Sequence, residues 1–438
     1  MKRRGFVPNI RTYTTMMSGY ASVEHWELYP KQLELVHSIY EQLTQHLKNS
    51  PNLVDDPVGE SGASSILYPI SLYISILGRA GKYQKAFDVF HKLDTDGPLA
   101  PHPKVYSSLL CALADRVDMA DAEAEAVAQS VSDAKYVWRR LMRSLDRQPQ
   151  HYIEPRSVEV MINVLSRGEP SDHELMFDIL RDICGLPRPN EARPPPPPKV
   201  RLTAWILTEV LASCVAAGHP AMAVHYAQNV MDARQLRPLL RPWHLYRILR
   251  AHILLAEEGL NSPARSENAA MLVEWMVAQG NETAPKTPVL LSALRLCYLC
   301  QDAPSALRIA RVMLEGPLLG LMPPTAWACL LRLADVASPD TKRQCLELLN
   351  SHSSVLDIWS SSSAIKQLEP RERRAHVSLA LCIIRVLRTD PPSPGHNGAE
   401  RPDAAELEQH EAWSDLRRRA ELFSKRTLEE IRPNRDRK

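Results

Sequence analysis

Apolar side chains in the first hundred residues recur at helical spacing, in segments that come in pairs. A helix is predicted to begin near Ile10, after the Pro8-Asn9 loop, because apolar residues then repeat every three or four positions. A second pair is predicted over residues 67–97, where Gly81 separates two amphipathic segments. A helical hairpin of this kind cannot bury its apolar face alone, so the pattern indicates units that stack on one another.

The same pattern returns one unit further along the chain. Tyr106 stands 36 residues after Ile70, and Ala122 stands 36 residues after Ala86. This spacing fits a repeat made of two helices. Later first helices are predicted around Val160, Leu207, Tyr246, Leu290 and Trp327. The longer intervals on either side of Val160 require insertions, and we expect about seven or eight repeats over residues 1–350.

Composition supports helices and excludes several other classes of protein. The chain has 438 residues, with 35 Pro, only 16 Gly and 6% aromatic residues, which disfavours a large β-sandwich or barrel. Few glycines also leave little material for phosphate-binding loops. The net charge of +2 gives no support for a strong, nonspecific electrostatic binder of nucleic acid.

Breaks in the pattern suggest an order of segments along the chain. The proline run in LPRPNEARPPPPPK is expected to adopt a stiff polyproline II conformation. The tail mixes Glu and Arg without a sustained apolar seam, so it is expected to be a solvated helix. The predicted organisation is N-terminal repeats over 1–185 (clearest at 5–125), a proline-rich linker or insertion over 186–199, degenerate C-terminal repeats over 200–350, capping helices over 351–390, and a flexible, charged helical tail over 391–438.

No motif for catalysis, a cofactor or a metal is found. The segment from Gly78 to Tyr83 has the wrong glycine spacing for a phosphate loop. Cys297 and Cys300 form a lone CxxC without a second ligand pair, which indicates core thiols rather than zinc. We therefore expect no catalytic residues, no metal, no cofactor and no enzyme activity. No apolar stretch is long enough to predict a membrane span.

The N-terminal pattern resembles the pentatricopeptide repeat family. Residues 1–9, MKRRGFVPN, are similar to the end of one repeat, and residues 10–14, IRTYT, to the opening of the next. Further family positions are matched by Gly81, Ala86, Phe90 and Leu93. The resemblance implies an all-α fold, a right-handed α-solenoid of stacked helix-turn-helix repeats. It is closest to the degenerate P-type repeats of fungal and animal mitochondrial proteins.

The resemblance also implies single-stranded RNA as the ligand, with one base read by each repeat. The first reader of each repeat follows the aromatic position of the first helix, and the second closes the repeat. The first readers map to Thr14, Ser71, Ser107, Thr208 and Arg247, and the second to Asn9, Asn52, His102, Arg156 and Asn190. Apolar residues occupy further reader positions at Met161, Leu291 and Ala328, so a complete base-by-base code is not expected.

Three clusters of arginine could contact RNA phosphates. They are Arg139, Arg143 and Arg147 beside Arg140; Arg234, Arg237, Arg241, Arg247 and Arg250; and Arg371, Arg373 and Arg374. Arg247 and Arg250 are favoured because they lie in a predicted first helix, the helix that lines the RNA groove in this family.

Two functions follow from these observations. The first is a non-catalytic RNA-binding protein of mitochondria that acts in the processing, stability or translation of organellar mRNA or rRNA. Its partners would include the small mitochondrial ribosomal subunit or other RNA-processing proteins. The alternative is a scaffold for protein partners, like tetratricopeptide proteins. Met1 falls inside a repeat whose first helix is missing, so we expect the natural product to extend upstream with a targeting segment.

Overall fold

A computed structural model describes residues 8–49, 62–94, 100–119, 123–148, 151–191, 193–280, 285–315, 322–352, 354–388 and 404–431. These residues are helical with connecting turns and contain no β-strand. The chain forms two compact units, which meet in sequence between Leu239 and Leu240. The proline-rich segment 186–199 therefore lies inside unit 1, and the sequence boundary between the units comes later in the chain.

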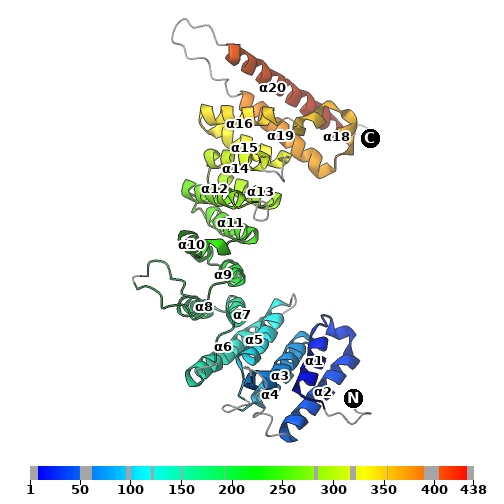
Figure 1. The fold of residues 1–438 in the computed structure, drawn as a ribbon. Coiled ribbons are helices and arrows are strands. Elements are labelled where there is room, and N and C mark those ends of the chain that lie inside the picture. Colours follow the sequence, from blue (N-terminus) through cyan, green and yellow to red (C-terminus); the bar gives the residue numbers. More distant parts are fainter. Residues whose placement is uncertain are drawn as a thin grey trace. The chain divides into compact units, whose positions relative to one another are not determined.

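The described residues of unit 1 form five helical hairpins (Figure 1). Their helices are α1 (Ile10–Ala21), α2 (Pro30–Asn49), α3 (Gly62–Arg79), α4 (Tyr83–His91), α5 (Pro103–Asp118), α6 (Ala124–Arg147), α7 (Pro155–Leu165), α8 (Pro170–Asp182), α9 (Ala204–Ala216) and α10 (Pro220–Asp232), with the short 3-10 turns η2 (Trp26–Leu28) and η4 (Arg237–Leu239). The first helices pack in chain order, α1 on α3, α3 on α5, α5 on α7 and α7 on α9. They form one continuous layer, and each second helix packs against its own first helix.

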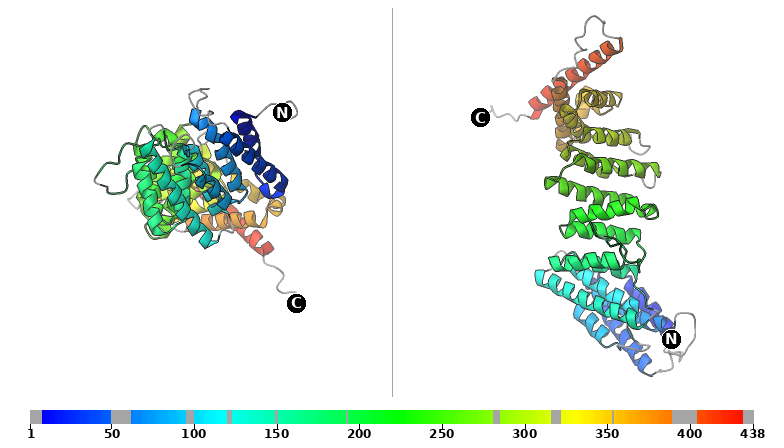
Figure 2. Two further views of the ribbon diagram at one scale, coloured as in Figure 1. Left: turned by 90° about the horizontal axis from the view of Figure 1, so that it is seen from below. Right: turned by 90° about the vertical axis from the view of Figure 1, so that its left-hand side faces the viewer.

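Unit 2, where the structure describes it, repeats this plan with three hairpins and a C-terminal cap (Figure 2). The hairpins are α11 (Pro242–Glu257) with α12 (Pro263–Ala278), α13 (Thr287–Leu299) with α14 (Ala303–Glu315), and α15 (Pro324–Val336) with α16 (Pro339–Ser351). The first helices again contact one another in order, and so do the second helices α12, α14 and α16. The cap contains α17 (Ser354–Asp357), η5 (Ile358–Ser360), α18 (Ser362–Gln367), α19 (Pro370–Arg388) and α20 (Ala404–Ile431).

These stacks confirm the predicted all-α fold class of stacked helical hairpins. The eight hairpins agree with the expected number of repeats, and every predicted first helix is present. The long interval after Tyr106 arises because α6 has 24 residues. The long interval before Leu207 contains the proline-rich segment.

Proline and glycine mark opposite ends of the helices. In the described part of the chain, proline stands in the first turn of twelve helices, where its missing N–H needs no partner and its fixed φ already suits a helix. Gly81, Gly218 and Gly259 follow the first helices α3, α9 and α11 with positive φ. Gln301 adopts the same left-handed conformation after α13 without being glycine. The unusual ratio of proline to glycine thus follows from the repeated hairpin.

One glycine is needed for packing rather than for a turn. Gly78 lies on α3, buried against Ala112 of α5. A Cβ at position 78 would stand 2.9 Å from the Ala112 Cα and still closer to its Cβ. The two first helices therefore approach one another closely at this point because neither residue carries a bulky side chain.

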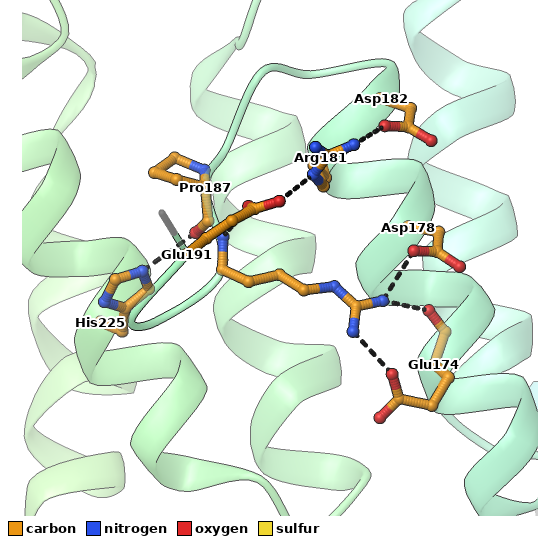
Figure 3. Close-up of polar contacts among 8 residues, drawn as sticks. Glu174, Asp178, Arg181, Asp182, Pro187, Glu191 and His225 are labelled. Carbon is orange, nitrogen blue, oxygen red and sulfur yellow. Dashed lines mark hydrogen bonds and ion pairs between the residues drawn. The ribbon is translucent and has the colours of Figure 1, made fainter. Parts of the chain in front are cut away.

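The proline-rich segment is fastened to the helices around it (Figure 3). Arg188 donates from Nη1 to Glu174 and from Nη2 to Asp178 of α8, both at 2.7 Å. The carbonyl of Pro187 lies 2.9 Å from Nε2 of His225 on α10. At its other end the backbone N–H groups of residues 199 and 200 donate to the carbonyl of Ile183. The segment is thus held at both ends within unit 1.

The C-terminal helix corrects one expectation from the sequence. Helix α20 packs on α19 and α16, and its buried side chains are Leu416, Ala420, Phe423, Ser424 and Thr427. The Phe423 ring stacks on Trp359 with ring centroids 4.8 Å apart. The expectation of a solvated helix is wrong for this face, because a narrow seam of small and apolar residues is enough to dock it. The flexible connection predicted before it, residues 391–403, lies outside the described residues.

Candidate nucleic-acid interface

The predicted first readers of unit 1 occupy equivalent places on successive first helices. Thr14 lies on α1, Ser71 on α3, Ser107 on α5 and Thr208 on α9. Each directly follows a buried residue of the core: Tyr13, Ile70, Tyr106 and Leu207. Because the first helices form one layer, the four hydroxyls belong to a single series.

These hydroxyls differ in how accessible they are. Ser71 is 3% exposed and Ser107 is 6% exposed, whereas Thr14 and Thr208 are half-buried. The Ser71 hydroxyl donates to the carbonyl of Tyr68 at 2.7 Å, and Thr208 donates to that of Ala204 at 2.8 Å. A hydroxyl that donates a hydrogen bond to a backbone carbonyl of its own helix still has lone pairs that can accept a hydrogen bond. Ser71 and Thr208 can therefore act as acceptors toward a base without losing these bonds.

The predicted second readers serve mainly at helix beginnings. Asn9 caps α1, because its Oδ1 accepts from the Thr12 backbone N–H at 3.0 Å. His102 caps α5 through Nδ1. Burial, together with nearby His151 and Lys104, lowers the pKa of His102 to about 4, so the ring is neutral at pH 7. Arg156 pairs with Glu159 at 3.1 Å.

The two remaining predicted second readers are Asn190 and Asn52. Asn190 lies inside the proline-rich segment with φ 58°, and Thr203 is the residue that caps the following helix α9. Asn52 lies outside the described residues. Asn190 therefore does not close a repeat next to the helix that should follow it.

Arg247 and Arg250 lie on α11 of unit 2, together with aromatic residues that sequence analysis did not single out. Trp243 is 46% exposed and Tyr246 is 47% exposed. Positions 243, 246, 247 and 250 share one helix face by their three- and four-residue spacing. Arg247 and Arg250 form no ion pair with any carboxylate in the described part of the chain. Exposed aromatic rings beside arginine suit single-stranded nucleic acid, since bases stack on the rings while guanidinium groups meet phosphates.

The three- and four-residue spacing of Trp243, Tyr246, Arg247 and Arg250 could have identified this face from the sequence alone. The complete candidate set is divided between the units, with the hydroxyls in unit 1 and the arginines in unit 2. One shared surface for both stays a prediction.

The apolar reader positions have core contacts. Met161 is fully buried and Ala328 is buried, while Leu291 is half-buried. Their first helices α7, α15 and α13 therefore offer no polar side chain at the reader position. Among the four polar positions of unit 1, two hydroxyls are nearly inaccessible as well.

The cysteines lie within the packed helices. Cys297 and Cys300 are buried, and burial raises the pKa of the Cys297 thiol well above its usual value. All eight cysteines are free thiols. In the described ranges, no three His, Cys, Asp or Glu side chains come together in a way that could hold a metal ion. Within the same ranges, no helix has the length and apolar character needed to cross a membrane.

Comparison with known families identifies the repeat type in the N-terminal part of unit 1. The model of the pentatricopeptide repeat (PPR) matches residues 11–28 and 71–98. The first match covers most of α1 and reaches η2, and the second includes the Gly81 turn and α4. The chain is therefore similar to the pentatricopeptide repeat at these two places, in agreement with the N-terminal pattern.

No curated protein matches the chain in sequence. Among solved structures, the chain is similar to the crystal structure of the pentatricopeptide repeat protein PPR10 from maize. The identity is 13%, and the match covers 96% of this chain and 68% of the maize chain. The TM-score is 0.30, so this likeness carries no further argument.

Proposed function

We propose that this protein is a non-catalytic RNA-binding protein whose first helices contact single-stranded RNA. The observation that carries the proposal is the match of two segments to the pentatricopeptide repeat, whose first helices α1 and α3 belong to one continuous layer. In repeats of this kind each unit contacts one base. Thr14, Ser71, Ser107, Thr208 and His102 are the proposed base contacts in the described part of unit 1, and Asn52 belongs to the same set.

Arg247 and Arg250 are proposed to bind phosphate, with Trp243 and Tyr246 as stacking surfaces. Because the reader positions at Met161, Leu291 and Ala328 are apolar, stacking and phosphate contacts contribute more to affinity than base reading does. The protein would then discriminate sequence at a few positions only.

The proposed setting is the mitochondrion, with an organellar mRNA or rRNA as the ligand. The protein would act in the processing, stability or translation of that RNA, through association with the small mitochondrial ribosomal subunit or with other RNA-processing proteins. This part of the proposal rests on the family resemblance of the N-terminal repeats.

Salt-dependent RNA binding tests the phosphate contacts. Replacing Arg247 and Arg250 together by alanine should weaken all single-stranded RNAs similarly and flatten the dependence of affinity on salt. The matched control replaces Arg193 and Arg201, two exposed arginines outside the three arginine clusters, by alanine. Equal losses in both double variants would contradict a specific role for α11.

Base reading needs a different substitution. Thr14→Ala should change the preference at one RNA position by about 1–3 kcal/mol, the size found for a good base contact. A uniform loss over all RNAs would contradict reading by Thr14.

A scaffold for protein partners is the second candidate. The burial of Ser71 and Ser107 favours it, because these hydroxyls leave little polar surface for a base. Under this alternative, affinity for RNA is negligible even at low salt and a protein partner co-purifies in stoichiometric amount.

A further inference from the structure

A pocket of about 320 Å³ lies in unit 1 where α5 begins and α6 ends. Residues 100 and 101, which precede α5, also line it. This volume is at the lower end of the range for small-molecule sites. The pocket does not include any of the proposed base contacts, so it is a separate feature of the molecule.

One wall of the pocket is a row of arginines on α6. Arg140, Arg143 and Arg147 all line it, at positions three and four residues apart on one helix face. Arg139, which the sequence pattern grouped with Arg143 and Arg147, is exposed and does not line it. The regular four-residue spacing predicts a face that begins at Arg139, whereas the arginines that line the pocket begin at Arg140.

The lining contains no carboxylate among the described residues. Arg140 and Arg143 also form no ion pair with a described acidic side chain. The Arg140 guanidinium instead lies over the Phe90 ring, 4.8 Å from its centroid. This concentration of positive charge at a hollow surface favours an anion, and guanidinium groups match the geometry of phosphate oxygens.

The rest of the pocket lining is aromatic and polar. Tyr136 is 41% exposed and also lines the pocket. Tyr106 is buried and lines the pocket, as does Ser144, whose hydroxyl donates to the carbonyl of Leu141 at 2.8 Å. Nδ1 of His151 stands 3.3 Å from the same Ser144 hydroxyl. Burial lowers the pKa of His151, so its ring adds hydrogen-bonding atoms rather than further charge near pH 7.

We propose that this pocket binds a ligand that combines a phosphate group with a flat ring, of the size of a mononucleotide. The phosphate meets Arg140 and Arg143, and the ring stacks on Tyr136. The volume exceeds what inorganic phosphate needs, and the exposed Tyr136 ring has no use for a simple anion. The ligand is either a free mononucleotide or the terminal nucleotide of an RNA strand. The proposal does not rest on base reading by the first helices.

Calorimetric titration of the full chain tests the site with adenosine monophosphate, adenosine and inorganic phosphate as probes. Adenosine monophosphate should bind at least about tenfold more tightly than either of the other two, because only it can contact both the arginines and the Tyr136 ring. Arg143→Gln should weaken it about tenfold or more, as should Tyr136→Leu. The matched control is Arg139→Gln, which removes the same charge from the same helix outside the pocket. It should change the affinity by less than about twofold.

Three results would overturn the proposal: no binding of adenosine monophosphate at low salt, equal losses in Arg143→Gln and Arg139→Gln, or equally tight binding of inorganic phosphate. Both arginines are exposed, so an unchanged melting temperature checks that the variants fold. Competition with a short RNA that carries a terminal phosphate distinguishes the two sources of ligand. Displacement of the mononucleotide by that RNA, but not by its dephosphorylated form, supports an RNA end, whereas no displacement supports a free mononucleotide. Arg247→Ala with Arg250→Ala leaves mononucleotide binding intact, which separates this site from the proposed RNA function.

Discussion

Replacing Gly78 by alanine tests the close packing of the first helices most sharply. The new methyl group would stand 2.9 Å from the Ala112 Cα, whereas carbon atoms pack best at about 3.5–4.0 Å. Helices α3 and α5 must therefore move apart by about 0.6 Å or more. Overpacking of this kind costs about 1–3 kcal/mol, and the contact is with backbone, so we take the upper half of that range. Alanine also favours a helix over glycine by about 0.5–1 kcal/mol, which leaves a net loss of about 1–2.5 kcal/mol.

Gly19→Ala is the matched control, and its expected effect on stability has the opposite sign. Gly19 lies in α1, and a Cβ there would meet no atom within 4 Å. This substitution should leave stability unchanged or raise it by up to about 1 kcal/mol. Adding Ala112→Gly to Gly78→Ala removes the closest methyl but leaves the backbone contact. The double variant should therefore lose less stability than Gly78→Ala and Ala112→Gly lose when their separate losses are added, and the difference should be at least about 1 kcal/mol.

Hydrogen exchange followed by mass spectrometry is the suitable assay, because peptides from α3 and α5 report on unit 1 separately from unit 2. Faster exchange in both helices is expected for Gly78→Ala. A variant that protects these amides as well as the original chain does would refute the close approach of α3 and α5. So would equal losses at positions 78 and 19.

Three further predictions concern the core and the proline-rich segment. In urea unfolding, Phe90→Ala should lower the free energy of unfolding by about 3–5 kcal/mol, because Phe90 is fully buried and packs edge-on against Tyr106. Phe87→Ala, on the half-buried side of the same helix, should lower it clearly less. Burial lowers the pKa of His252 to about 4, so the unfolded chain binds the proton first as pH falls. The contribution of the neutral His252 ring to the free energy of unfolding is complete above pH 6.5. It decreases by up to about 3 kcal/mol as the pH falls toward 4. His252→Gln should flatten the dependence of unit 2 stability on pH in that window, and an unchanged slope would contradict this assignment. Arg188→Ala should speed hydrogen exchange around residues 183–200, while Arg193→Ala, an exposed arginine in the same segment, should not.

The helical plan could be predicted because the forces that set it are local. Proline in a first turn and Gly81 at a helix end act within a few residues, so they are visible in sequence. The docking of α20 was missed because Phe423 and Thr427 bury against helices far away in the chain, and their spacing alone is weak. The close approach of Gly78 and Ala112 likewise depends on tertiary packing.

The candidate site was predicted less completely than the fold. Reader positions can be counted from the repeat, but accessibility cannot, as the buried Ser71 shows. The exposed Trp243 and Tyr246 carried a readable signal, since they share helical spacing with Arg247 and Arg250. The pocket beside Tyr106 could not be predicted, because it requires Tyr136 of α6 to lie next to the residues that precede α5.

RNA crosslinking followed by mapping of the crosslinked peptides tests the central claim most directly. The account predicts single-stranded RNA attached to peptides from the first helices, including those that contain Thr14, Ser107 and Tyr246. It also predicts that the sequenced RNAs share a short preference rather than a long motif, because several reader positions are apolar. Purified protein that yields no crosslink even at low salt, while a protein partner accompanies it in stoichiometric amount, would contradict the RNA function and leave a helical scaffold.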